Sequence, residues 1–372
     1  MEIHRRSIVI DAHVDQCAFG LVYTDEMVQR MREMLDAGEH YSKIRGKMWR
    51  MGMDAVTKDE KLRGQYAGIW KKSGVTCVCR AVAVRNLDEI LVNISNNLVF
   101  HRWGDLLVPA TSAEDILRAK EEGKRAVMWG MEGTEGIGFD LDKLNWLHEL
   151  GVRIVTLTYN RRNLVGDGCT ERYQSGLSNF GLMFVEKLNE LGMIVDVAHS
   201  GYQTTLDAIE ASKDPIVFSH TGCRAVYDHD RNKKDEEIKA MADKGGVIGI
   251  YAVPSFVGER GTIDEVLDHI DHAVKIAGVD HVGIGTDYDG APDKILPLIE
   301  RIAEAKVADS LRHWVTGFRP EHFRKQMRLV GLEDWSKFFN ITRGLVSRGY
   351  SNQEIQKILG GNILRIFDKV MG

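Results

Sequence analysis

The chain has 372 residues, of which 44% are hydrophobic and 28% are charged, as in a globular protein with a sizeable core. Its 54 acidic and 49 basic residues are interspersed and give a net charge of −5, which argues against nucleic acid or an anionic membrane as the main partner. The N-terminus lacks the apolar core of a signal peptide, no apolar run is long enough to span a membrane, and five cysteines without a Cys-x-x-Cys pair predict free thiols in a cytoplasmic protein.

Short runs rich in β-branched residues alternate along the chain with segments of helical periodicity. Most of these runs are almost continuously apolar, which is typical of parallel strands covered on both faces. Segments such as NFGLMFVEKLNELG carry apolar residues at helical spacing and end at glycine. The alternation predicts an α/β fold, a (β/α)8 TIM barrel, rather than a sandwich. The eight predicted strands are Ser7–His13, Val75–Val84, Arg125–Glu132, Ile154–Asn160, Met193–His199, Pro215–His220, Val247–Val253 and His281–Asp287.

We expect residues 1–372 to form a single domain in which two helical insertions lengthen the barrel. The first insertion, about 20–74, follows the first strand, and the second, about 291–334, follows the eighth. Within the first, a stripe of apolar residues at helical spacing predicts a core-facing helix surface rather than a cofactor site. The stripe consists of Met27, Met31, Met34 and Leu35. Near the C-terminus, Ser351 and Glu354 have the spacing of a capping box.

Polar side chains gather at the carboxyl ends of the predicted strands, where barrel enzymes place their chemistry. In chain order these residues are His13 with Asp15, Glu132, Tyr159, His199, His220 and Asp287. Imidazole and carboxylate ligands suit zinc or a similar borderline metal. The set offers five histidine and carboxylate ligands and a further carboxylate. Because a carboxylate can bridge two cations, five such ligands indicate two metal ions with open positions, as in hydrolytic sites about 3.5–4 Å across.

Several motifs occur in a fixed order: IDAHVD in the first strand, GMEG in the third, VDVAHSG and PIVFSHTG in the fifth and sixth, and HVGIGTDYDG in the eighth. The run DHDRN and the C-terminal GYSNQEIQKILGGNILRIF complete the series. Together these motifs resemble the renal (membrane) dipeptidase family, peptidase family M19 of the amidohydrolase superfamily. The resemblance extends over nearly the whole chain.

This resemblance implies a binuclear zinc dipeptidase. It implies that His13, Asp15 and Glu132 hold one metal ion, and that Glu132, His199 and His220 hold the other. It also implies tolerance of a D-residue at the C-terminal side of the dipeptide, and a homodimer.

The resemblance implies that Asp287 transfers the proton and that Arg231 binds the terminal carboxylate of the substrate. One departure concerns the fourth strand, where the family pattern TLTH carries a histidine and this chain has TLTYN, with Tyr159 at that place. A phenol can donate a hydrogen bond to a developing oxyanion, but it offers no cationic imidazolium. We therefore expect Tyr159 to affect substrate preference and rate rather than metal binding.

Two alternatives stay open on the sequence. One is a related metal-dependent amidohydrolase that acts on N-acyl amino acids or lactams, for which Tyr159 leaves room. The other is a non-catalytic metal-bearing binding protein, against which the intact ligand set and Asp287 argue.

We expect the remaining carboxylate, histidine and cysteine candidates to have structural rather than catalytic roles. We expect Glu135 to be a loop carboxylate, and Asp11 to be at most a partner that orients the nearby imidazole. The pair His269 and His272 is interpreted as the polar face of a helix, and His229 as structural. The same structural interpretation applies to the closely spaced Cys77 and Cys79.

Overall fold

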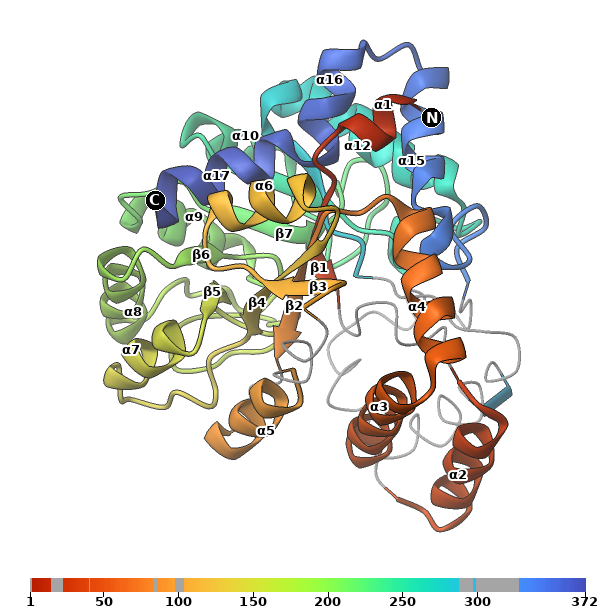
Figure 1. The fold of residues 1–372 in the computed structure, drawn as a ribbon. Helices are drawn as coiled ribbons and strands as arrows, with labels where there is room; N and C mark the ends of the chain where they lie inside the picture. The colour runs from red at the N-terminus through yellow and green to blue at the C-terminus, as the bar shows by residue number, and fades with distance from the viewer. Residues whose placement is uncertain are drawn as a thin grey trace.

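The computed structural model describes residues 2–14, 23–39, 41–82, 86–97, 104–287, 297–298 and 328–372. In this part of the chain, parallel strands follow one another around a nearly closed barrel in the order β1-β2-β4-β5-β6-β7-β8-β9 (Figure 1). The predicted α/β barrel is therefore confirmed. Its strands are β1 (Ile10–Val14), β2 (Cys77–Val82), β4 (Arg125–Glu132), β5 (Val152–Thr156), β6 (Ile194–Asp196), β7 (Val217–Thr221), β8 (Val247–Ile250) and β9 (Val282–Ile284). A short additional strand, β3 (Leu107–Pro109), was not predicted and pairs with the start of β4 outside this path.

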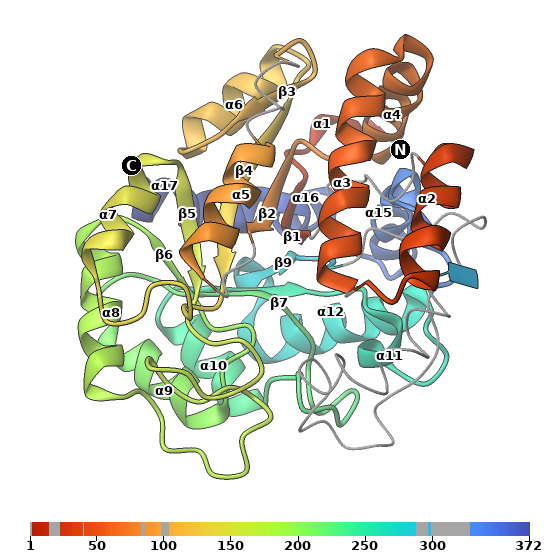
Figure 2. The ribbon, with the colours of Figure 1, turned by 90° about the horizontal axis from the view of Figure 1, so that it is seen from below.

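Helices surround the strands and cover the outside of the barrel (Figures 1 and 2). In chain order they are α1 (Glu2–Arg6), α2 (Asp25–Asp36), α3 (Tyr41–Lys58), α4 (Glu60–Ser73), α5 (Leu87–Asn97), α6 (Ala113–Glu121), α7 (Asp142–Glu149), α8 (Asn179–Glu190), α9 (Tyr202–Ala211), α10 (Asp235–Asp243), α11 (Pro254–Val257), α12 (Ile263–Ala277), α15 (Phe339–Ser347), α16 (Asn352–Gln356) and α17 (Asn362–Met371). Short 3-10 segments lie at Val279–His281 and Trp335–Lys337, and a π-helical turn at Lys357–Gly361 joins α16 to α17. None of the helices in the described part of the chain combines the length and apolar character needed to cross a bilayer.

Hydrogen bonds beyond the strand ladders connect the last strand to the first. The backbone N–H of Asp287 donates to the carbonyl of His13 over 2.9 Å. The buried carboxylate of Asp11 in β1 accepts from the N–H and the hydroxyl of Thr286, at 2.7 and 2.6 Å. These bonds join the segment that follows β9 to β1, where the polar side chains gather.

Alternate residues of the strands face two different cores, as the period of a pleated strand requires. In β2, Cys77 and Cys79 belong to an inner cluster, while Val78 and Val82 belong to the outer layer that packs against the helices. Helix α17 contributes apolar side chains to the inner cluster, which also contains the first residue of β1, Ile10. The carboxyl ends of the strands are therefore left for polar side chains.

The first insertion consists of helices in its described part, and α2, α3 and α4 stand together beside the barrel in both views (Figures 1 and 2). The methionine stripe of α2 is buried against α3, where it meets Ile44 and Met48, so its core-facing interpretation is confirmed. Most of the second insertion lies outside the described residues. The predicted capping box is confirmed, because Ser351 and Glu354 exchange hydrogen bonds at the start of α16.

The predicted bounds of several strands were wrong by a few residues. Helix α1 occupies the chain before β1, which begins at Ile10 rather than Ser7. Strand β5 ends at Thr156 and β6 at Asp196, so Tyr159 and His199 lie in the segments that follow the strands. The carbonyl of His199, for example, accepts from the N–H of Cys169 in a loop rather than from a neighbouring strand. Apolar content alone does not mark where a chain leaves the ladder.

Candidate metal centre

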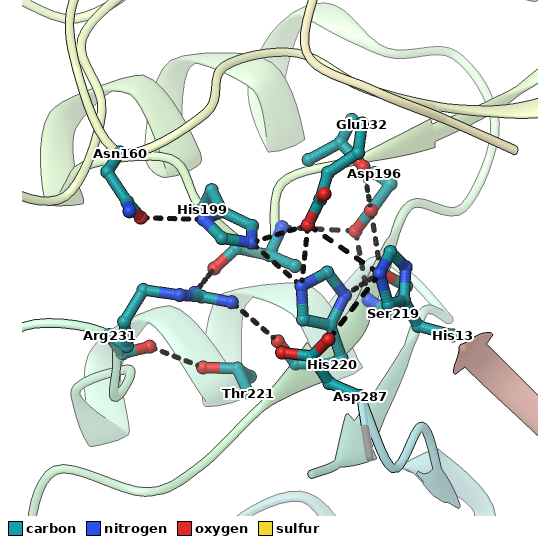
Figure 3. A network of polar contacts seen from close by, with 12 residues as sticks. His13, Glu132, Asn160, Asp196, His199, Ser219, His220, Thr221, Arg231 and Asp287 are labelled. Atoms are coloured by element: carbon teal, nitrogen blue, oxygen red, sulfur yellow. Dashed lines mark hydrogen bonds and ion pairs between the residues drawn. The ribbon is translucent and has the colours of Figure 1, made fainter. Parts of the chain in front are cut away.

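One carboxylate oxygen lies at the centre of the polar cluster (Figure 3). The Oε1 atom of Glu132, the last residue of β4, is 2.9 Å from Nε2 of His199, 3.3 Å from Nε2 of His220 and 3.6 Å from Nε2 of His13. The three imidazoles are almost completely buried, and Glu132 is largely so. Oδ1 of Asp287 lies 3.8 Å from the same Nε2 atom of His13. Residues at the ends of five different strands thus meet within a few ångströms.

Irregular strand pairing places two of these histidines. In β1, three residue steps from Asp11 to Val14 face two steps of β2, and His13 lies in this bulge. In β7, three steps from Phe218 to Thr221 face two steps of β8, and His220 lies in that bulge. A bulge inserts one residue and redirects its side chain, which is why such irregularities occur at barrel rims and beside active sites.

Hydrogen bonds fix the tautomers of two imidazoles. Nδ1 of His199 is 2.7 Å from Oδ1 of Asn160, and an amide oxygen only accepts, so Nδ1 carries the proton. Nδ1 of His220 is 2.8 Å from Oγ of Ser219, whose hydroxyl hydrogen is already given to a carboxylate, so here too Nδ1 is the donor. A neutral imidazole in this tautomer has a bare lone pair on Nε2. The two Nε2 atoms lie 2.8 Å apart.

The electrostatic surroundings keep these imidazoles neutral. Burial, followed by the positive charge of Arg231, holds the pKa of His199 well below its usual range. Burial and then His13 do the same for the pKa of His220. Burial raises the pKa of the Glu132 carboxyl, but His13 and His199 outweigh it, so this pKa lies well below its usual range. The result at neutral pH is a Glu132 carboxylate beside the neutral imidazoles of His199 and His220, the protonation states that metal ligation requires.

This donor set fits a divalent metal ion. Two nitrogen lone pairs and a carboxylate oxygen facing one another repel unless a cation lies among them. In the described part of the chain, two sets of donor atoms lie within 4.8 Å of one another: Glu132 with His199 and His220, and His13 with His220 and Asp287. Nitrogen and oxygen donors with no thiolate suit zinc.

A family model described as membrane dipeptidase (peptidase family M19) matches residues 1–300 and 323–371. The chain belongs to this family. Dipeptidase tcpJ of Claviceps purpurea (strain 20.1) is 30% identical over 277 residues, which are 73% of this chain and 57% of that protein. The chain spans 57% to 64% of the length of the curated relatives that it matches.

Two solved structures have a similar fold. An amidohydrolase from Pseudomonas aeruginosa is 27% identical with a TM-score of 0.73, over 100% of this chain and 98% of that one. A metallopeptidase from Rhodobacter sphaeroides, solved with a phosphinate mimic of the dipeptide L-Ala-D-Ala, is 20% identical with a TM-score of 0.72, over 98% and 99% of the two chains. At its lower identity, the second supports the fold alone.

The structure brings together most of the residues that the M19 motifs pointed to. His13, Glu132, His199, His220 and Asp287 lie in one cluster, as described above. The remaining expected ligand, Asp15, lies outside the described residues. Asp287 is also the one non-glycine residue of the described chain with a positive φ, at 49°. Such a conformation is uncommon for a non-glycine residue and tends to occur at functional sites.

Arg231 is buried beside the cluster, 1% exposed, with its guanidinium directed at backbone carbonyls (Figure 3). Nη1 donates to the carbonyl of Ala198, and Nη2 donates to the carbonyl of His220 over 3.2 Å. Its Nε–H has no hydrogen-bond partner in the described part of the chain. Arg231 thus contacts the segments that carry His199 and His220, and its buried Nε–H is available to a ligand.

Tyr159, the residue that departs from the family pattern, lies against a metal-ligand candidate. Its ring stacks on the imidazole of His199, with centroids 4.4 Å apart and planes inclined by 21°. The next residue, Asn160, receives the Nδ1–H of the same imidazole. The TLTYN run therefore supports His199 from its face and from its edge.

The carboxylate of Asp11 accepts from Thr286 and, more weakly, from the backbone N–H of His13 at 3.4 Å, so it joins the first strand of the barrel to the segment after the last. One structural interpretation needs correction. His269 is not on a polar face but fully buried, and its Nδ1 accepts from the N–H of Cys223.

The other structural interpretations agree with the structure. His272 is partly exposed and pairs with Asp235 over 2.8 Å, as a polar helix face predicts. Glu135 is exposed in the turn after β4. His229 is buried and accepts from the backbone N–H of Arg231. Cys77, Cys79, Cys169 and Cys223 are free thiols, and Cys17 lies outside the described residues.

The sequence analysis did not identify the residues whose hydrogen bonds orient the imidazoles of His199 and His220. Asn160, Asp196 and Ser219 supply these hydrogen bonds. The only signal in the sequence is that each lies next to, or three residues before, a site residue. That signal is too general to identify a partner.

Proposed function

We propose that this member of the M19 family is a binuclear zinc dipeptidase. The observation that carries the proposal is the convergence of three buried imidazole nitrogens on one oxygen of Glu132. A carboxylate in that position is suited to bridge two cations. The family membership and the dipeptidases among the curated relatives support the same activity.

In this proposal His13, Asp15 and Glu132 would hold one zinc ion, and Glu132, His199 and His220 would hold the other. When bound, the two ions would supply a water of lowered pKa and polarise the scissile carbonyl. The Nδ1 partners of His199 and His220 keep the Nε2 lone pairs directed at the site.

Asp287 would take a proton from the attacking water at Oδ1 and pass it to the nitrogen of the leaving amine. Its position beside His13, in the segment that follows β9, supports this role. Arg231 would bind the terminal carboxylate of the dipeptide through its spare Nε–H, which favours substrates that end one residue after the scissile bond.

Tyr159 would shape the pocket beside His199 or donate its phenol hydrogen to the developing oxyanion. The mimic bound to the R. sphaeroides enzyme ends in D-Ala, so we include acceptance of a C-terminal D-residue in the proposal. A cytoplasmic location and a homodimer stay predictions.

A substrate panel tests the proposed activity. The purified full chain, loaded with zinc, is assayed on L,L- and L,D-dipeptides, tripeptides, N-acyl amino acids and lactams. We expect hydrolysis of dipeptides, and loss of activity on tripeptides because their carboxylate lies beyond Arg231. Turnover of N-acyl amino acids or lactams in preference to dipeptides would replace the proposal with the related amidohydrolase. No turnover of any substrate with both metals bound would indicate a binding protein.

A further inference from the structure

A buried carboxylate behind the metal centre has no role in the proposed chemistry. Asp196, the last residue of β6, is fully buried. Its Oδ1 accepts from the backbone N–H groups of Ala198, at 3.0 Å, and Ser219, at 2.9 Å. Its Oδ2 accepts from the hydroxyls of Thr156, at 2.5 Å, and Ser219, at 2.6 Å. All four groups, which come from three residues, are donors, so every bond is directed toward the carboxylate.

These bonds determine what Ser219 can offer to its neighbour. A serine hydroxyl has one hydrogen, and here the carboxylate of Asp196 takes it. Oγ of Ser219 can therefore only accept from Nδ1 of His220, 2.8 Å away. The chain of bonds runs from His220 through Ser219 to Asp196 (Figure 3), and it leaves the Nε2 lone pair of His220 facing Glu132.

The bulge in β7 makes this chain possible. Consecutive residues of a regular strand point to opposite faces, so Ser219 and His220 would otherwise face apart. The extra residue between Phe218 and Thr221 removes that constraint. Gly249 and Gly285 accommodate the bulge, because a Cβ at either position would collide with the carbonyl oxygen of Ser219.

We propose that Asp196 is a positioning residue of the metal centre, which acts through Ser219 to hold His220 in the tautomer that binds metal. The inference rests on the proposed metal site and deepens it. A carboxylate polarises the serine hydroxyl, and the serine oxygen in turn strengthens His220 as a metal ligand. His199, by contrast, is held by the neutral amide of Asn160, so the two imidazoles differ in their support.

Three substitutions separate this role from ordinary stabilisation. Asp196→Asn keeps the shape but puts an NH2 group at the Oδ2 position, so Ser219 must accept from it and donate its own hydrogen to Nδ1 of His220. The proton of a neutral imidazole then moves to Nε2, where it blocks metal binding. Ser219→Ala removes the connection. Thr156→Val removes a hydroxyl from the same carboxylate oxygen without touching His220, and serves as the matched control.

The measurement is zinc and cobalt(II) affinity of the metal-free full chain, by competition with a chromophoric chelator. We expect Ser219→Ala to lose about 10- to 100-fold in affinity for one of two ions, as is typical when a metal ligand loses its supporting partner. We expect Asp196→Asn to lose about 100-fold or more, since the blocked nitrogen adds to that loss. Thr156→Val should stay within about threefold of the parent chain, although its thermal midpoint falls as in Ser219→Ala.

A second readout needs no metal. Nitrogen-15 shifts of labelled histidine in the metal-free protein report the tautomer, and Asp196→Asn should move the His220 proton from Nδ1 to Nε2. Affinity of Asp196→Asn within threefold of the parent, an unchanged tautomer, or equal losses in Ser219→Ala and Thr156→Val would overturn the inference. A parent chain that binds no zinc would instead overturn the proposed function.

Discussion

Asp287 offers the sharpest test of the proposed chemistry, because its two properties can be separated. It lies three residues after β9 with a left-handed backbone at φ 49°, and its Oδ1 lies 3.8 Å from Nε2 of His13. Asparagine tolerates a left-handed backbone but cannot take up a proton, whereas alanine satisfies neither condition. We therefore compare Asp287→Asn with Asp287→Ala.

Loss of a general base costs about 10²- to 10⁴-fold in rate, or roughly 3–5 kcal/mol of barrier at about 1.36 kcal/mol per factor of ten. Both variants should show this loss in kcat on a dipeptide. Only Asp287→Ala should also lose stability, by about 1–2 kcal/mol, from the left-handed backbone. Denaturant unfolding of the metal-free chains measures that difference, with the parent as control.

Metal content must be measured on the same samples, since Asp287 also lies within ligand distance of His13 and His220. A rate close to the parent's in Asp287→Asn with both metals present would show that the base is another group. Loss of a metal ion in Asp287→Asn would reassign Asp287 as a ligand.

Three further predictions concern other parts of the molecule. Tyr159→His should keep both metals but change the ratio of kcat/KM values across a dipeptide panel, because it replaces the ring stacked on His199; an unchanged profile would contradict this. Burial lowers the pKa of His269 to about 4 from 6.5, so between these pH values the unfolded chain binds a proton that the folded chain does not. The free energy of unfolding should therefore fall by about 3 kcal/mol as the pH drops from 6.5 to 4, and His269→Gln should lose that slope in urea titrations of the metal-free chain; an equal slope would refute the assignment. Gly249→Ala should destabilise the fold by about 1–3 kcal/mol, since its Cβ would collide with the Ser219 carbonyl. Gly64→Ala, at a position within α4 where a Cβ meets no other atom, should not destabilise it. Equal stability of the two variants would count against the bulge argument.

The ligand candidates were predictable because of two regularities of parallel barrels. The carboxyl ends of the strands meet at one rim, so polar residues that end separate strands come together in space. Histidine at positions 13, 199 and 220 stands out against apolar strand residues, and this contrast is visible without a structure. The order of the motifs along the chain then indicated the family.

What escaped prediction depends on the paths of hydrogen bonds and on small departures from regular pairing. The two-residue period of a strand predicts that Ser219 and His220 lie on opposite faces. The sequence carries no sign of the bulge that brings them together. Asp196 reads as an ordinary strand-end residue until its four donors are known. His269 looks like half of a polar pair, although its helix turns it into the core.

We propose above all that the chain needs two zinc ions for dipeptide hydrolysis, and that Glu132 would help to hold both. The most direct test is a zinc titration of the metal-free full chain, with dipeptide turnover and bound zinc measured at each step. We predict no turnover without metal, and full activity when two equivalents are bound. Full activity in the verified absence of metal, or with a single bound equivalent, would contradict it.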